Sequence, residues 1–177
     1  VMQTLRMDAQ LLPDLIRALK AWGPVWAPVE REHPGVFSLE VLDDVGVARP
    51  DALRTIVPFK KLLLEPKFAM MTANSDGRAV ESTENDKGQQ VFFGAHACDV
   101  HALKILEMLY MTDYVDPYYK RNRDDLLVVG YGCWPDGKCF CQSLHTSTVD
   151  EGFDLFLTPL EDRYIVKVGT SRGDDIV

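Results

Sequence analysis

All four cysteines of the chain have the chemistry and spacing to serve one metal site. Cys98 stands alone ahead of an expected helix, and Cys133, Cys139 and Cys141 crowd into the segment GCWPDGKCFCQS. Four thiolates are the ligand set of an iron–sulfur cluster or of a structural zinc ion. The segment lacks the ferredoxin spacing of two residues between successive ligands, so the pattern indicates a metal site without naming the metal.

Two apolar runs are expected to position these cysteines. Residues 91–93 predict a short strand, and Cys98 follows it in a loop before a helix that opens at Asp99. Residues 126–129 predict a second strand, and the other three cysteines follow that one. Continuous apolar runs are typical of strands covered on both faces, and ligand sites in such sheets lie beyond the carboxyl ends of the strands. We therefore expect both cysteine groups at strand ends, with Cys98 near the positive end of a helix dipole.

The cysteine segment has its own local pattern. Cys139 and Cys141 are separated by Phe140 alone, so in extended backbone the two cysteines point the same way and Phe140 points toward the core. Residues 135–137 carry a turn signal that lets the chain fold back on itself. Trp134 is expected to shield the site from water.

The remaining patterns predict a mixed α and β fold. A helix capped by Asp8 is expected to run to about Trp22, and the alternation at 37–41 predicts a half-buried strand. Residues 56–66 are expected as strand or loop, and the polar stretch 74–90 as an exposed loop or weak hairpin. Two apolar stretches, 153–160 and 164–168, predict a C-terminal hairpin.

These elements indicate an α/β (mixed α+β) class with a central sheet of strand–loop–helix units. We expect one domain over 1–177, with a helix and strand region at 1–55 and a cluster-binding core at 56–177. The formal charge of −8 argues against nucleic acid or an anionic membrane as a partner. No apolar run approaches the roughly 18 residues that span a bilayer, and no signal peptide is visible, so a cytoplasmic location without disulfides is expected.

Several strings together resemble a known family: PFKKLLLEP, FFGAHACDVHALKILEMLY, DPYYKRNRDDLLVVGYGC, KCFCQS and GFDLFLTPLEDRYIVKVGT. They are similar to the β-subunit family of sulfhydrogenase or sulfur reductase, which also includes a subunit of anaerobic sulfite reductase. The resemblance runs from about residue 58 to residue 169. It implies a [4Fe–4S] cluster on Cys98, Cys133, Cys139 and Cys141.

The resemblance further implies an iron–sulfur electron-transfer subunit of a cytoplasmic multisubunit oxidoreductase. Its partners would be a catalytic hydrogenase or reductase subunit and a flavin subunit, with FAD nearby or on that partner. The chain departs from the family at His96–Ala97, where members usually carry Arg–Pro, and it holds no further sets of cysteines.

Two other functions stay open. A zinc-bound docking module would use the same cysteines only to hold its fold. A flavin-binding oxidoreductase subunit would carry its own FAD. Weaker signals are His96 and His101, expected in packing or beside the ligands, and a lone Gly-x-Gly at 130–132. His145 is expected either to donate a hydrogen bond to a sulfur or to face solvent.

Overall fold

A computed structural model describes residues 3–81 and 87–177, and its centre is a mixed β-sheet. In these two segments, seven strands join in the order β1-β9-β8-β7-β6-β2-β3. The strands are β1 (Gln3–Asp8), β2 (Val25–Glu30), β3 (Phe37–Val41), β6 (Gln90–Ala95), β7 (Leu126–Tyr131), β8 (Leu155–Pro159) and β9 (Arg163–Val168).

The middle of the sheet is parallel and its edges are antiparallel. Strands β2, β6, β7 and β8 pair in parallel as neighbours. β3 pairs antiparallel with β2 at one edge, while β9 runs antiparallel between β8 and β1 at the other. The parallel strands therefore end together, and the loops that follow β6 and β7 leave the sheet side by side.

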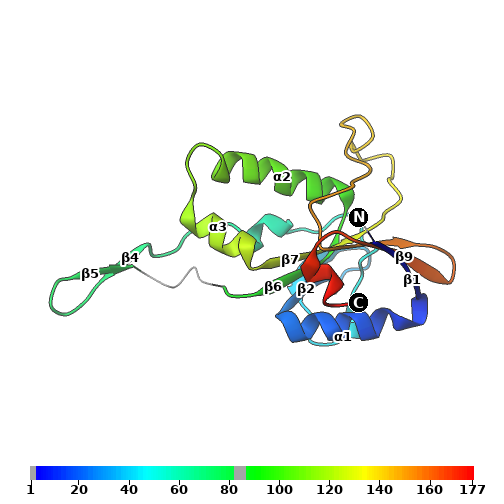
Figure 1. The fold of residues 1–177 in the computed structure, drawn as a ribbon, viewed down its shortest axis with the longest axis horizontal. Coiled ribbons are helices and arrows are strands. Elements are labelled where there is room, and N and C mark those ends of the chain that lie inside the picture. The colour runs from blue at the N-terminus through cyan, green and yellow to red at the C-terminus, as the bar shows by residue number, and fades with distance from the viewer. Residues whose placement is uncertain (1–2, 82–86) are drawn as a thin grey trace.

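Helices cover both faces of the sheet, as Figure 1 shows. Helix α1 (Leu12–Trp22) lies on one face, and α2 (Ala97–Met111) and α3 (Pro117–Asp124) lie on the other. Each face has its own cluster of buried apolar side chains, one packed around α1 and one around α2 and α3. Every residue of β6 and of β7 is buried, as the continuous apolar runs predict.

The predicted mixed class is confirmed, together with most of the elements that carry it. The apolar runs at 91–93 and 126–129 lie inside β6 and β7, and 37–41 is β3. The C-terminal hairpin is β8–β9. It is followed by the short helix α4 (Ser171–Asp174). The division of the domain into 1–55 and 56–177 stays a prediction.

Strand β2 is an element that the sequence patterns did not reveal, because it contains a proline. Pro28 pairs with Leu39 of β3, but β2 pairs with β6 only at Val25 and Trp26. The proline lies beyond these two pairs, where the strand needs no N–H donor toward β6. Strand β1 and helix α3 were missed as well.

Residues 56–66 form neither a strand nor an irregular loop throughout, because Phe59–Leu62 is a 3₁₀ helix with Phe59 and Leu62 buried. Strands β4 (Met71–Ala73) and β5 (Ala79–Glu81) form the weak hairpin expected in this region, and it projects from the body of the molecule (Figure 1). Residues 82–86 of the predicted stretch lie outside the described residues. Within the described segments, no helix combines the length and apolarity that crossing a bilayer requires.

Candidate metal centre

The two cysteine groups follow the neighbouring ends of β6 and β7. In the parallel register of these strands, Ala95 lies opposite Gly130. Cys98 is the third residue after Ala95, and Cys133 is the third residue after Gly130. The sheet therefore places the two cysteine groups after adjacent strand ends, as the sequence predicted.

Cys98 lies in the first turn of α2 rather than ahead of it. The helix begins at Ala97 with His96 as its N-cap, so the expected start at Asp99 was wrong. The Asp99 carboxylate accepts a hydrogen bond from the His96 backbone N–H at 2.9 Å. An acidic side chain at the third helical position satisfies the cap in this way, which explains why Asp99 suggested a cap three residues too late.

The cysteine loop, residues 132–153, leaves β7 and folds back through a turn at Asp136. The Cys139 N–H donates to the Asp136 carbonyl at 3.1 Å, and the Lys138 N–H donates to the Asp136 carboxylate at 2.9 Å. Farther along, the Cys141 carbonyl accepts from the Thr146 N–H at 2.8 Å. This loop lies beside the N-terminal end of α2 (Figure 1). There, a ring nitrogen of His101 is 2.9 Å from the Thr148 carbonyl oxygen.

Two aromatic side chains of the cysteine loop are not where the sequence pattern placed them. Phe140 is 74% exposed and Trp134 is 84% exposed, so Phe140 is no core anchor and Trp134 does not bury the site. The alternation of side chains holds only within a strand, and residues 139–141 belong to none. The loop therefore presents both rings to solvent.

The four thiols lie near enough to influence one another's ionisation. All four are free cysteines; Cys98 is exposed, and the other three are partly buried. Burial, then the charges of Asp99, Cys133 and Cys141, raise the pKa of Cys98 to about 11. Burial also raises the pKa of Cys133, with smaller contributions from Cys141 and Cys139. A bound cation would relieve this repulsion, which is the electrostatic property expected of a thiolate ligand set.

The four thiols have the chemistry of a metal ligand set, but they do not converge on one point in this structure. Among residues 3–81 and 87–177, no three histidine, cysteine, aspartate or glutamate side chains converge as metal ligands. Three of the four cysteines belong to a loop that forms no helix or strand.

A guanidinium from a distant segment enters the site, and sequence reasoning missed it. Arg54 Nη1 lies 3.1 Å from Asp136 Oδ1 and 3.5 Å from Cys139 Sγ, and its Nη2 also pairs with the carboxylate. The Cys139 thiol is 3.3 Å from Asp136 Oδ1. Hydrogen bonding to Arg54, and then to the Lys138 N–H, holds the pKa of Asp136 well below its usual range. Because 82 residues separate Arg54 from Asp136, no local pattern could have paired them.

Cavities flank the start of α2. One of about 260 Å³ is lined by Cys98, Asp99, Arg54 and His96 among others. A second, of about 230 Å³, is lined by Cys133 and Ala97. His96 is buried, and its Nε2 has no hydrogen-bond partner among the described residues.

The lone Gly-x-Gly after β7 has a packing explanation. A Cβ atom on Gly130 would lie 2.2 Å from Cδ2 of Phe156, and one on Gly132 would lie 3.3 Å from Cδ of Pro159. Both glycines therefore allow β8 to pack closely against the end of β7. His145 is exposed on the cysteine loop and adopts a left-handed backbone with φ of 54°.

Comparisons with known proteins point to one relative. The chain is 37% identical over 177 residues to the sulfhydrogenase 2 subunit beta of Pyrococcus furiosus, which covers 99% of the chain. The chain spans 51% of the length of that relative. No family model and no solved structure matches. The similarity covers nearly the whole of this chain, including the segments that carry all four cysteines, and it supports the resemblance to the sulfhydrogenase beta-subunit family.

Proposed function

We propose that this chain holds a [4Fe–4S] cluster on Cys98, Cys133, Cys139 and Cys141 and relays electrons as a subunit of a cytoplasmic oxidoreductase complex. The observation that supports the proposal is the register of β6 and β7, which brings the start of α2 with Cys98 to the same edge of the sheet as the loop with the other three cysteines, 35 to 43 residues later. The relative is a subunit of a sulfhydrogenase by name, which supports an oxidoreductase complex for this chain too.

The chain's own groups suit an anionic cluster. Cys98 lies in the first turn of α2, where unpaired backbone N–H groups and the helix dipole favour negative charge. The raised thiol pKa of Cys98 means that ligation has to release a proton there at neutral pH. When bound, the cluster would supply one-electron oxidation and reduction.

Exposed apolar side chains on the cysteine loop and on α2 support a partner subunit. Trp134, Phe140 and Leu144 are all exposed on the cysteine loop. Ile105, Met108 and Leu109 are exposed on α2. Aromatic and methionine side chains are enriched in protein interfaces, and an electron relay needs its partner close to the redox group. Electrons would pass between a flavin or a further cluster and the catalytic subunit.

Iron and acid-labile sulfide analysis of anaerobically purified protein tests the proposal. Four irons and four sulfides per chain are expected, with visible absorption that bleaches on reduction. Colourless protein with stoichiometric zinc would contradict the cluster and support the docking module. Flavin released on denaturation would support the flavin-binding subunit.

Single Cys→Ser variants test the ligand assignment. Each of the four should lower the iron content or change the paramagnetic spectrum of the reduced protein, including Cys98→Ser. The matched control is Ser147→Ala on the same loop, which should change neither. Unaltered iron and spectrum in Cys98→Ser would remove Cys98 from the ligand set.

A further inference from the structure

The segment that carries Arg54 is anchored independently of the cysteine loop. The Ile56 N–H donates to the Phe37 carbonyl of β3 at 2.9 Å, and Ala52 is buried. The Thr55 hydroxyl donates to the Val57 carbonyl at 2.9 Å. Arg54 therefore extends toward the cysteine loop from a base that the sheet holds in place.

On the loop side, one carboxylate connects Arg54 to the turn before Cys139. Asp136 Oδ1 accepts from Arg54, from the Lys138 N–H and from the Cys139 thiol. A two-pronged guanidinium–carboxylate contact restricts geometry more than a single-point contact with lysine. The turn is thus tied to the body of the protein through Arg54.

The same contact sets the local charge. Asp136 places a negative charge beside Cys139, and Arg54 offsets that charge while directing an N–H toward the sulfur at 3.5 Å. A positive charge and N–H donors near sulfur favour the reduced form of a cluster, which carries one more negative charge.

We propose that Arg54 is a positioning residue for the cysteine loop and the local counter-charge that raises the reduction potential of the group bound there. The positioning role stands on the contacts alone. The effect on potential rests on the proposed function.

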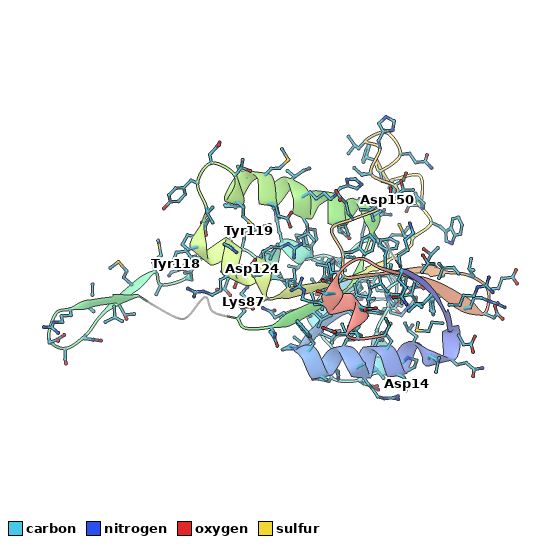
Figure 2. The ribbon with its side chains drawn as sticks, in the orientation of Figure 1. Asp14, Lys87, Tyr118, Tyr119, Asp124 and Asp150 are labelled. Carbon is cyan, nitrogen blue, oxygen red and sulfur yellow. The ribbon has the colours of Figure 1, made fainter. Side chains whose placement is uncertain are left out.

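The positioning role is tested in metal-free protein by amide hydrogen exchange. Arg54→Gln should speed exchange at the Lys138 and Cys139 amides about threefold, the scale of a surface ion pair. Arg54→Lys should also speed it, because lysine lacks the two-pronged contact. Arg17→Gln is the matched control, since Arg17 forms an exposed ion pair with Asp14 on α1. Figure 2 shows Asp14 on the far side of the sheet from the loop that carries Asp150.

The counter-charge role is tested in reconstituted protein by redox titration. Arg54→Gln should lower the ratio of reduced to oxidised cluster about threefold at a fixed solution potential. For a one-electron couple, this corresponds to a reduction potential lower by about 30 mV. Arg54→Lys should restore most of this ratio because it keeps the charge.

The outcomes separate the two roles. Unchanged exchange in Arg54→Gln overturns the positioning role, and an unchanged ratio overturns the counter-charge. Wild-type protein that retains no iron or sulfide would refute the proposed function and the counter-charge with it. The exchange experiment still decides the positioning role in that case.

Discussion

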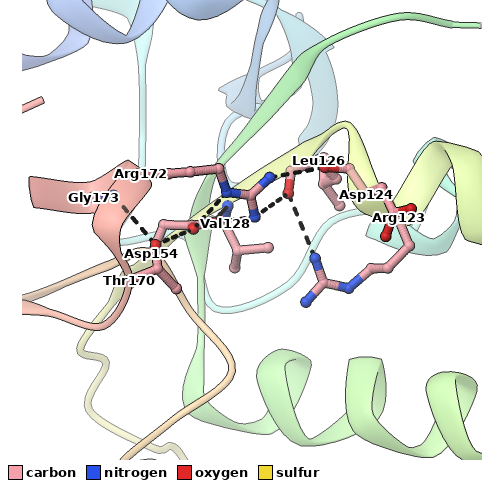
Figure 3. Close-up of polar contacts among 8 residues, drawn as sticks. All are labelled: Arg123, Asp124, Leu126, Val128, Asp154, Thr170, Arg172 and Gly173. Atoms are coloured by element: carbon pink, nitrogen blue, oxygen red, sulfur yellow. Dashed lines mark hydrogen bonds and ion pairs between the residues drawn. The ribbon is translucent and has the colours of Figure 1, made fainter. Parts of the chain in front are cut away.

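Replacement of Asp154 by alanine should destabilise the fold more than any change of a surface carboxylate. Asp154 opens the return of the cysteine loop into β8 and is 1% exposed. Its carboxylate accepts from the Val128 N–H at 2.7 Å, from the Thr170 hydroxyl at 2.5 Å and from Arg172 Nε at 3.1 Å. Figure 3 shows these contacts joining Asp154, just before β8, to β7 and to the start of α4.

The magnitude follows from what the substitution leaves behind. The Val128 N–H stays buried in the sheet without its side-chain acceptor, at a cost of about 1–3 kcal/mol. Loss of the charge-assisted bonds to Arg172 and Thr170 adds about 1.5–3 kcal/mol. Arg172 recovers part of this because it also donates to the Asp124 carbonyl at 2.8 Å and is partly exposed. We expect Asp154→Ala to lower the free energy of unfolding by about 3–5 kcal/mol, in the range for breaking a buried ion pair.

Urea unfolding of the metal-free protein, followed by circular dichroism, measures this loss. Asp154→Asn keeps the shape and one acceptor oxygen, so about half of the loss is expected. The control is Asp14→Ala, which breaks an exposed pair with Arg17 and should change the free energy of unfolding by less than about 0.5 kcal/mol. A loss below about 1 kcal/mol for Asp154→Ala, with an unchanged urea slope, would refute the reasoning.

Two further substitutions test the packing and the pH dependence. The buried Tyr119 hydroxyl has no partner in the described part of the chain, so Tyr119→Phe should leave stability at pH 7 unchanged or raise it by up to about 1 kcal/mol. Burial, and then the charge of Glu107, raise the pKa of Tyr119 to about 12. The folded state therefore holds the Tyr119 proton more tightly than the unfolded state does. The stability that this difference contributes is complete below about pH 10 and is lost as the pH rises toward 12. Wild type should lose about 1.4 kcal/mol from this group by pH 11 and Tyr119→Phe should not; equal pH profiles in urea unfolding would contradict this. Gly130→Ala drives a Cβ into the Phe156 ring and should cost about 1–3 kcal/mol in thermal unfolding. Gly137→Ala, whose Cβ would meet no atom within 4 Å, should cost far less, and similar losses for the two would exclude the clash as the cause.

Local sequence patterns predicted an element correctly where the burial of that element's own residues determines its structure. The run 126–129 is apolar without interruption because β7 is covered on both faces, and four consecutive apolar residues are enough to indicate such a strand. The same holds for 91–93 in β6. Strand β2 could not be found in this way, since Pro28 is acceptable only because β2 pairs with β6 over two residues.

The sequence alone determined the thiol chemistry and the succession of strand, loop and helix that carries it, because residue type and periodicity are local properties. Only the tertiary structure decided that Ala95 lies opposite Gly130, that Arg54 reaches Asp136 and that Phe140 faces solvent. These facts depend on strand order, register and the course of a loop, which arise from contacts between residues far apart in the chain. The cysteines could be read as candidate ligands from their spacing, while the groups that hold and charge-balance their loop appeared only once the sheet had brought distant segments together.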